Sequence, residues 1–209
     1  PEFRANMLDY FNACMNVAER IASALCKTLK LPSDAMAPVF GPKQASFIRL
    51  NHYPENDPVA VQDRNGINPL GDMALHHHTD PGMITLLLQD GVGGLQTLSK
   101  DGWIDVPPVP GTIIVNLSDM LQVWTNNQYK AAIHRVLPVE QSRYSVPFFY
   151  QPNMRAEIAP IDMLSRGSPE YRPFMWRDFI NARAEGNFDD YGEETQVSDF
   201  SIAPTAVTA

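Results

Sequence analysis

The sequence predicts a mainly β protein with flanking α-helices, whose core is a double-stranded β-helix, or jelly roll. Between residues 46 and 150, about eight short segments rich in β-branched and aromatic residues follow one another, separated by glycines and prolines. A longer amphipathic pattern precedes these segments, and another follows them. Many short strands framed by helices are typical of a jelly roll, and we expect the functional site inside one end of it.

Residues 4–30 predict a long amphipathic helix. Apolar residues recur there at alternating spacings of three and four, which places them on one face of a helix. This face consists of Leu8, Phe11, Met15, Ala18, Ala22, Leu25 and Leu29. Pro32 ends the pattern, because proline cannot continue a helix. We expect residues 1–45 to form this helix and a connector, both packed on the core.

The strands that follow predict one domain over residues 46–202, with a featureless tail at 203–209. SFIRLNHY (46–53) predicts a strand, and the turn-rich residues 54–72 predict a loop near the mouth of the site. TIIVNL (112–117) is typical of a buried strand. Pro147 indicates an edge position or a bulge, because proline cannot donate a hydrogen bond to the sheet.

Two further helices are expected. SDMLQVWTN (118–126) predicts a short helix with Ser118 as its N-cap, and we interpret Trp124 as a core aromatic more than as a pocket wall. Residues 173–185 predict a surface helix. Its expected inward residues are Phe174, Phe179 and Ile180, and its expected outward residues are Arg177, Asp178 and Arg183.

The segment HHHTDPG (76–82) carries the clearest signal for a metal. Alternate side chains of an extended segment share a face, so His78 and Asp80 project together while His77 and Thr79 point away. The only histidine further along is His134, in a short apolar segment that could lie beside the first in a sheet. Two histidines and one carboxylate form a facial triad, the ligand set of non-haem Fe(II) with open positions.

Other interpretations of the same residues stay open at this point. An HxD pair alone is weak evidence, because a solvated turn can carry it. A zinc site could instead use His76, His78 and Asp80, since His76 and His78 also share a face. The triad is favoured by a second polar pair, Arg143 and Ser145, which alternate onto one face of a later strand. A guanidinium beside a hydroxyl is a receptor for a carboxylate.

Composition narrows the class of protein. The chain of 209 residues has a formal net charge of −8, and its Lys and Arg residues are scattered, which argues against a nucleic-acid partner. Its apolar runs are far shorter than the ~20 residues that span a bilayer. Cys14 and Cys26 fall on one helix about 18 Å apart along the axis, so they cannot pair. So few cysteines favour a reducing, cytoplasmic compartment.

The sequence resembles the Fe(II)- and 2-oxoglutarate-dependent dioxygenases of the isopenicillin N synthase type. The matching segments, in family order, are NHYP (51–54), HTDPG (78–82), ITLLLQD with VGGLQ (84–96), WIDVPPVPGTIIVNLSDMLQVWTN (103–126), HRV (134–136) and RYSVPFF (143–149). The resemblance implies that His78, Asp80 and His134 bind iron, and that Arg143 and Ser145 hold the distal carboxylate of 2-oxoglutarate. It also implies that Asn51 and Tyr53, the family's NxY positions, lie near this cosubstrate.

The resemblance further implies an enzyme that uses Fe(II), 2-oxoglutarate and O2 to oxidise a small organic molecule, with release of succinate and CO2. Hydroxylation is the expected outcome, with desaturation or ring closure as variants. An oxidase of the isopenicillin N synthase kind, which uses no 2-oxoglutarate, and a non-enzymatic metal-binding jelly roll are the alternatives. Members of this family usually carry a further segment ahead of the region where this chain begins, so we expect that segment to be absent here.

Overall fold

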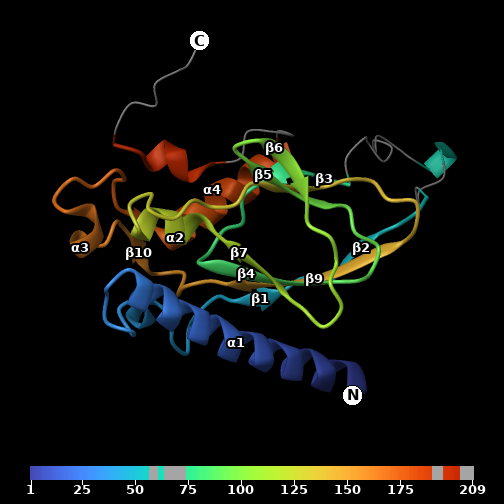
Figure 1. Ribbon diagram of the computed structural model, residues 1–209, viewed down its shortest axis with the longest axis horizontal. Coiled ribbons are helices and arrows are strands. Elements are labelled where there is room, and N and C mark those ends of the chain that lie inside the picture. The colour runs from blue at the N-terminus through green and yellow to red at the C-terminus, as the bar shows by residue number, and fades with distance from the viewer. Residues whose placement is uncertain (57–60, 64–73, 190–194, 203–209) are drawn as a thin grey trace, which may run out of the picture.

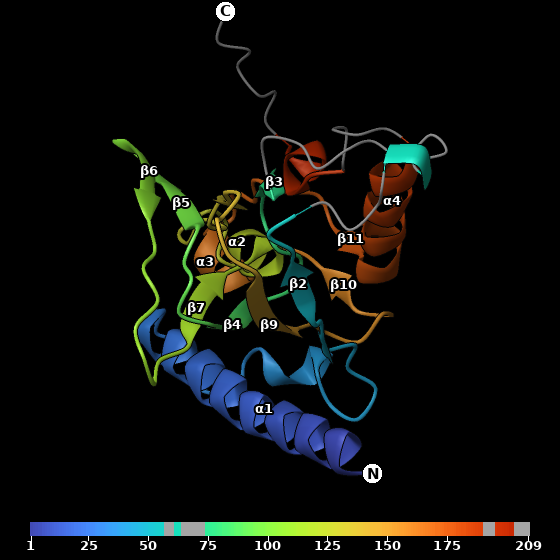
Figure 2. The ribbon, with the colours of Figure 1, turned by 90° about the vertical axis from the view of Figure 1, so that its right-hand side faces the viewer.

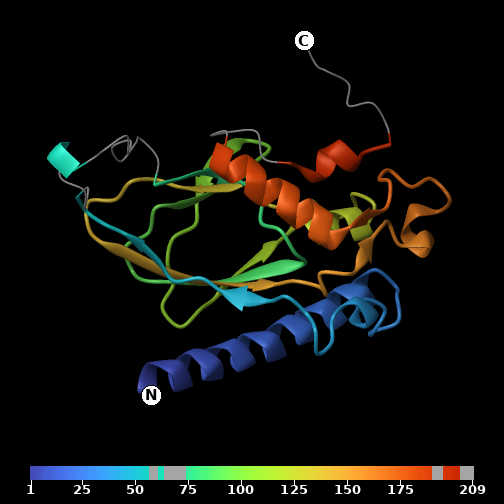
Figure 3. The same ribbon diagram turned by 180° about the vertical axis from the view of Figure 1, so that it is seen from behind.

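Two antiparallel sheets face each other in the computed structural model, which describes residues 1–56, 61–63, 74–189 and 195–202. Helix α1 (Glu2–Thr28) runs along the outer face of the larger sheet, and the smaller sheet lies on the other side (Figure 1). Helix α4 (Trp176–Asp189) lies on the side of the molecule opposite α1 (Figure 3). The predicted class, a β-rich jelly roll flanked by helices, is confirmed.

The larger sheet has the order β1-β9-β4-β7, and β2 also pairs with β9. Its strands are β1 (Phe47–Ile48), β2 (Asn51–Tyr53), β4 (Ile84–Gln89), β7 (Ile114–Leu117) and β9 (Arg143–Tyr150). The smaller sheet has the order β3-β8-β5-β6. Its strands are β3 (Leu75–His78), β5 (Leu95–Ser99), β6 (Gly102–Asp105) and β8 (His134–Val136). The sheets alternate along the chain, as a jelly roll requires.

Several of the remaining elements gather at one end of the two sheets (Figure 1). Strands β10 (Glu157–Ile158) and β11 (Phe174–Met175) pair with each other and lie beside α4 (Figure 2). The short helices are η1 (Ala37–Val39), η2 (Val61–Asp63), α2 (Asp119–Trp124), α3 (Asp162–Ser165) and η3 (Val197–Phe200). None of the described helices is long and apolar enough to cross a membrane.

The core fills the space between α1 and the larger sheet and continues to the buried residues of α2, β10, β11 and α4. Alternation along β4 and β9 points one set of side chains toward α1, and Phe148 from this set meets Phe11 edge-on, with ring centroids 5.3 Å apart. The predicted helix is confirmed, but its buried face is shifted, because Leu8 is exposed whereas Cys14 and Cys26 are buried. Both thiols are free, as their spacing predicted.

Several predicted elements differ in detail. Residues 46–53 form two short strands, β1 and β2, in place of one. The strand expected to be buried at 112–117 is β7, which lies at the edge of the larger sheet and leaves Val115 46% exposed. Ser118 is the N-cap of α2 as predicted, although its side chain makes no capping hydrogen bond. Most of the loop predicted at 54–72 lies outside the described residues.

The prediction that Pro147 marks an edge or a bulge is wrong. Strand β9 lies inside the larger sheet, between β4 and the β1/β2 side, and Pro147 faces Leu87 in regular register. The carbonyl of Pro147 accepts from the Arg49 amide on the β1/β2 side. The proline nitrogen faces the same side, where the neighbouring strand is interrupted between β1 and β2. Its missing N–H therefore costs no hydrogen bond to β4.

The placement of Arg183 on the outer face of the last helix is also wrong. Phe174 and Phe179 are buried as expected, with Phe174 in β11 ahead of the helix, but Arg183 is only 5% exposed. Arg183 is buried because it forms an ion pair with the fully buried Asp119. The interpretation of Trp124 as a core residue is confirmed: it is 5% exposed and packs edge-on against Phe40.

Candidate active site

His78, Asp80 and His134 meet at one end of the smaller sheet. His78 ends β3 and His134 begins β8, and the two face each other in the register of these strands. Asp80 lies two residues beyond His78, still on the same side of the chain. The Nε2 atoms of both histidines lie 3.6 Å from Asp80 Oδ1, and all three ligand atoms lie within 4.8 Å of one another.

Backbone carbonyls orient both imidazole rings. Nδ1 of His78 lies 2.8 Å from the His76 carbonyl oxygen, and Nδ1 of His134 lies 2.9 Å from that of Ala132. Each Nδ1–H can therefore donate to its carbonyl, which leaves the Nε2 lone pair directed at the shared centre. The imidazole of His76 is exposed and does not belong to this cluster, so the geometry favours His134 over His76 as the third ligand.

Asn116 supports the cluster from β7 in the opposite sheet. Its Nδ2 donates to Asp80 Oδ2 over 3.0 Å and lies 3.2 Å from His134 Nδ1. Sequence reasoning did not single out this residue. A signal existed, because Asn116 is the one polar residue within the apolar strand IIVNL, and Ile114 shares its inward face.

The electrostatics of the cluster favour a cation. Burial alone would raise the pKa of Asp80, but hydrogen bonding to His78 and the nearby histidine charges lower it to about 2. Burial lowers the pKa of His134, and the neighbouring His78 lowers it further. Burial also opposes protonation of His78, but its hydrogen bond to Asp80 and the carboxylate charge outweigh this effect and raise its pKa. The site thus holds a carboxylate that attracts positive charge.

The donor set fits Fe(II). Two imidazole nitrogens and one carboxylate oxygen converge from one side, which is the arrangement of a facial triad with open positions for other ligands. Other divalent metals of the first transition series also bind such donors, so the triad alone defines only a class of metal site. The residues of the surrounding cavity restrict that class further.

A cavity of about 310 Å³ extends from the triad between the two sheets. Its walls are largely apolar and include Leu75, Leu87, Leu95, Val106, Ile114 and Val136. Among the described residues, the charged groups on its wall besides the triad are Arg143 and Arg49. Arg143 is 1% exposed, whereas the side chain of Arg49 is exposed.

The guanidinium of Arg143 is held in place by neutral partners. Nε donates to the Gly93 carbonyl over 2.7 Å, Nη1 to Ser145 Oγ over 3.4 Å and Nη2 to Gln89 Oε1 over 3.3 Å. The ring of Tyr53 lies against the guanidinium, 4.9 Å from centroid to Cζ. No carboxylate within the described part of the chain lies at ion-pair distance from Arg143, so its charge is available to a ligand.

The polar residues expected beside Arg143 also come together here. Asn51 faces Ser145 and Tyr53 faces Arg143 across β2 and β9, and Asn51 Nδ2 lies 3.4 Å from Ser145 Oγ. All of these residues line the same cavity as the triad. Gln89 and Gly93, which orient the guanidinium, were missed by sequence reasoning. Gly93 has a φ of 94°, a conformation that favours glycine and that turns its carbonyl toward Arg143.

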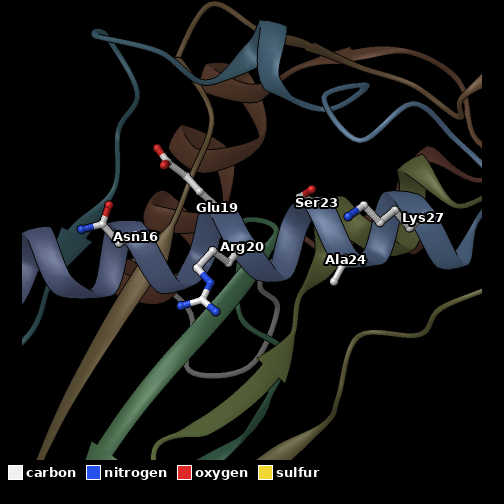
Figure 4. Close-up of a pocket in the computed structure, with 6 residues that line it drawn as sticks. All are labelled: Asn16, Glu19, Arg20, Ser23, Ala24 and Lys27. Atoms are coloured by element: carbon white, nitrogen blue, oxygen red, sulfur yellow. The ribbon is translucent and has the colours of Figure 1, made fainter.

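A second hollow, of about 580 Å³, lies on the outer side of α1 and is open to solvent. Asn16, Glu19, Arg20, Ser23, Ala24 and Lys27 line it, and their side chains spread over the helix surface without converging on a centre (Figure 4). It shares no residue with the cavity at the triad. We therefore place the candidate active site between the sheets.

The fold and the site define a jelly-roll protein in which a cluster of two histidines and one carboxylate shares a cavity with a buried arginine. Residues 44–152 match the model of the 2OG-Fe(II) oxygenase superfamily, and the chain belongs to this family.

Two relatives and one solved structure illustrate the likeness. Scopoletin 8-hydroxylase of Arabidopsis thaliana is 32% identical over 180 residues, which cover 83% of this chain and 47% of that protein. 1-Aminocyclopropane-1-carboxylate oxidase 3 of the same plant is 34% identical over 190 residues, which cover 88% and 55%. The structure of JOX2 in complex with 2OG, Fe and JA is 29% identical with a TM-score of 0.78, and the match covers 98% of this chain and 58% of that one. The chain thus spans about half the length of the relatives it matches.

Proposed function

We propose that this chain carries the active site of an Fe(II)- and 2-oxoglutarate-dependent oxygenase that oxidises a small organic molecule. The observation that carries the proposal is the meeting of two groups in one cavity. The triad of His78, Asp80 and His134 lies on the wall of this cavity, and so does the buried Arg143, which has no carboxylate partner among the described residues. A metal chelated by a dicarboxylate would use both groups at once.

Each residue of the cavity has a proposed role that follows from its position. His78, Asp80 and His134 would hold Fe(II), and Arg143 with Ser145 would bind the far carboxylate of 2-oxoglutarate. Asn51 and Tyr53 would keep Ser145 and the guanidinium in place, through the contacts described above. Bound Fe(II) would supply the activation of O2, coupled to oxidative decarboxylation of 2-oxoglutarate. The apolar walls exclude water, which limits side reactions and strengthens the charged contacts.

The stoichiometry of the proposed reaction is that of a hydroxylation. One 2-oxoglutarate and one O2 are consumed for each C–H bond oxidised, and the products are succinate, CO2 and the hydroxylated substrate. One oxygen atom enters succinate and the other enters the substrate. Desaturation or ring closure would instead release the second oxygen atom as water.

The decisive experiment measures CO2 released from 2-oxoglutarate labelled at C1. Protein loaded with Fe(II) under reducing conditions should release labelled CO2, and a variant carrying Asp80→Ala should not. An oxidase of the isopenicillin N synthase kind would bind iron and consume O2 without releasing this label. A non-enzymatic binding module would bind metal but show neither O2 consumption nor label release.

The oxidase is the nearest competing function, and the relatives include both a hydroxylase and an oxidase by name. The buried guanidinium indicates an anionic ligand in both cases, because a charge taken out of water requires an ionic partner and the described residues supply none. A carboxylate ligand is the simplest such partner. The oxidase would use the same triad and the same Arg143 and Ser145 pair, so release of the label from 2-oxoglutarate distinguishes the two functions.

The proposal also covers the domain organisation of the chain, its partner and its location in the cell. Residues 46–202 would form the oxygenase domain, and residues 1–45 would form a helix and connector packed on it. A small molecule is the expected partner, since a net charge of −8 disfavours nucleic acid. The free thiols of Cys14 and Cys26 support a reducing, cytoplasmic location, because both are buried and unpaired.

A further inference from the structure

A buried ion pair stands behind the triad and belongs to neither the metal cluster nor the cavity wall. Arg183 of α4 is 5% exposed, and its Nη1 pairs with Oδ2 of Asp119, which is fully buried in the first turn of α2. Nη2 of the same guanidinium donates to the carbonyl of Thr79 over 2.5 Å. Thr79 is the residue between the two expected ligands His78 and Asp80.

Asp119, the other member of the ion pair, binds the next carbonyl along the chain, that of Asp80. The backbone N–H of Asp119 donates to the carbonyl oxygen of Asp80 over 3.0 Å. The amide of Met120 likewise donates to Gly82 over 2.8 Å. Consecutive carbonyls of the ligand segment, at Thr79 and Asp80, are therefore fixed by the two residues of one ion pair. This segment has left strand β3, so no sheet ladder holds it.

We propose that Asp119 and Arg183 are positioning residues for the metal site, and that they couple α4 to the geometry of His78 and Asp80. The inference rests on the proposed function, since it concerns the ligands of the proposed metal. Neither side chain touches the expected metal or substrate. Their effect is on the backbone that carries two ligands, and through it on the affinity for the ion.

Stability alone does not account for this arrangement. The cost of removing two charges from water offsets most of their attraction, and apolar residues of similar size often replace a buried ion pair without loss of stability. Such a replacement would also remove the donor to the Thr79 carbonyl. A stabilising role and a positioning role therefore predict different outcomes for the same double substitution.

The experiment compares Co(II) binding, followed by its visible absorption, with thermal unfolding of the same metal-free proteins. The variants are Arg183→Met, Arg183→Lys and the double variant Asp119→Leu with Arg183→Met. Arg177→Met is the matched control, because Arg177 lies on the same helix, is exposed and pairs only with its neighbour Asp178 in the described structure. Co(II) is the probe because it takes the same donors as Fe(II) and does not oxidise readily in air.

Arg183→Met should weaken Co(II) binding about 10- to 100-fold, as substitutions behind a metal site typically do, and should also lower the unfolding temperature. The double variant should regain stability while its Co(II) affinity stays weak, with an altered absorption spectrum. Arg183→Lys should recover part of the affinity, because an ammonium can pair with Asp119 but cannot serve both acceptors with a planar fork. The control should match the wild type.

Recovery of Co(II) affinity in the double variant would overturn the inference and assign the pair a purely structural role. Unchanged affinity in Arg183→Met would overturn it as well, and would leave the proposed function intact. If the wild type bound no Co(II), the proposed function and this inference would fail together. If it bound Co(II) but no 2-oxoglutarate, only the proposed function would fail.

The coupling has a reciprocal consequence that can be measured without substitutions. If α4 stabilises the metal site, metal binding must stabilise the docking of α4 by the same free energy. Adding Co(II) should therefore slow amide hydrogen exchange in the first two turns of α4, relative to exchange in α1. Equal exchange in α4 with and without Co(II) would contradict the coupling.

Discussion

Replacing Arg143 by alanine tests the assignment of the cosubstrate site. Each nitrogen of the guanidinium already donates one hydrogen bond to the protein, and each terminal nitrogen retains a second N–H for a ligand. In the proposed site these two remaining N–H groups would bind a carboxylate in a bidentate manner. Because Arg143 is 1% exposed, water cannot take the place of the lost donors once the cavity is filled.

Removing one partner of a buried, hydrogen-bonded charge pair costs about 2 to 5 kcal/mol. That cost corresponds to a dissociation constant for 2-oxoglutarate that is about 30-fold to several thousand-fold higher. Arg143→Lys should recover only part of the loss, since an ammonium cannot reproduce the fork. Iron binding should not change, because Arg143 does not belong to the metal cluster.

The assay is an anaerobic titration of 2-oxoglutarate into the Fe(II) protein, followed by the visible charge-transfer band of the chelate. Arg155→Ala is the control, because the Arg155 side chain is exposed and lies away from the cavity. Equal dissociation constants for wild type and Arg143→Ala would refute the assignment, and would remove the main support for 2-oxoglutarate as the ligand of this cavity.

Three further predictions concern the metal. Turnover should be abolished, with little loss of fold, in each of the variants His78→Ala, Asp80→Ala and His134→Ala. Iron should still bind to His76→Ala and His77→Ala. Loss of iron in His76→Ala, measured by metal analysis, would favour the zinc alternative. Asn116→Ala should weaken Co(II) binding about 10-fold or more, since it frees Asp80 Oδ2; an unchanged titration would show that Asn116 does not orient the ligand. Co(II) affinity should fall as pH decreases, because the ligands must be neutral histidines. The raised pKa of His78 places the start of this fall above the pH expected for an ordinary histidine, and a decline confined to lower pH would contradict it.

Local geometry explains why the grouping of His78, Asp80 and His134 could be predicted. His78 and Asp80 were placed together by the alternation of an extended chain, and His134 is brought to them by the register of two neighbouring strands. Arg143 and Ser145 follow the same alternation on β9. None of these inferences needs more than the direction of side chains along one or two strands.

The errors arose where packing between distant segments decides the outcome. Arg183 was assigned to the surface because of its charge, although it lies one helical turn after Phe179 and therefore shares the inward face of that residue. Its partner Asp119 is 64 residues away along the chain, beyond the reach of any periodicity. Pro147 was excluded from the sheet interior by a sound rule, but the interruption between β1 and β2 removes the cost on which that rule depends.

The formal charges of the assembled site give a physical reason for these particular residues. In the proposed site Fe(II) would bring two positive charges and Arg143 one, while Asp80 would bring one negative charge and 2-oxoglutarate two, so the complete site would be neutral when both histidines are neutral. A site that held only one of these two ligands would not be neutral. Metal alone leaves two uncompensated positive charges at a largely apolar cavity, and 2-oxoglutarate alone brings its carboxylate against Asp80, which is 5% exposed. Because uncompensated charge is costly away from water, each component should favour the binding of the other. The exposed Arg49 contributes little to this balance, since solvent screens its charge.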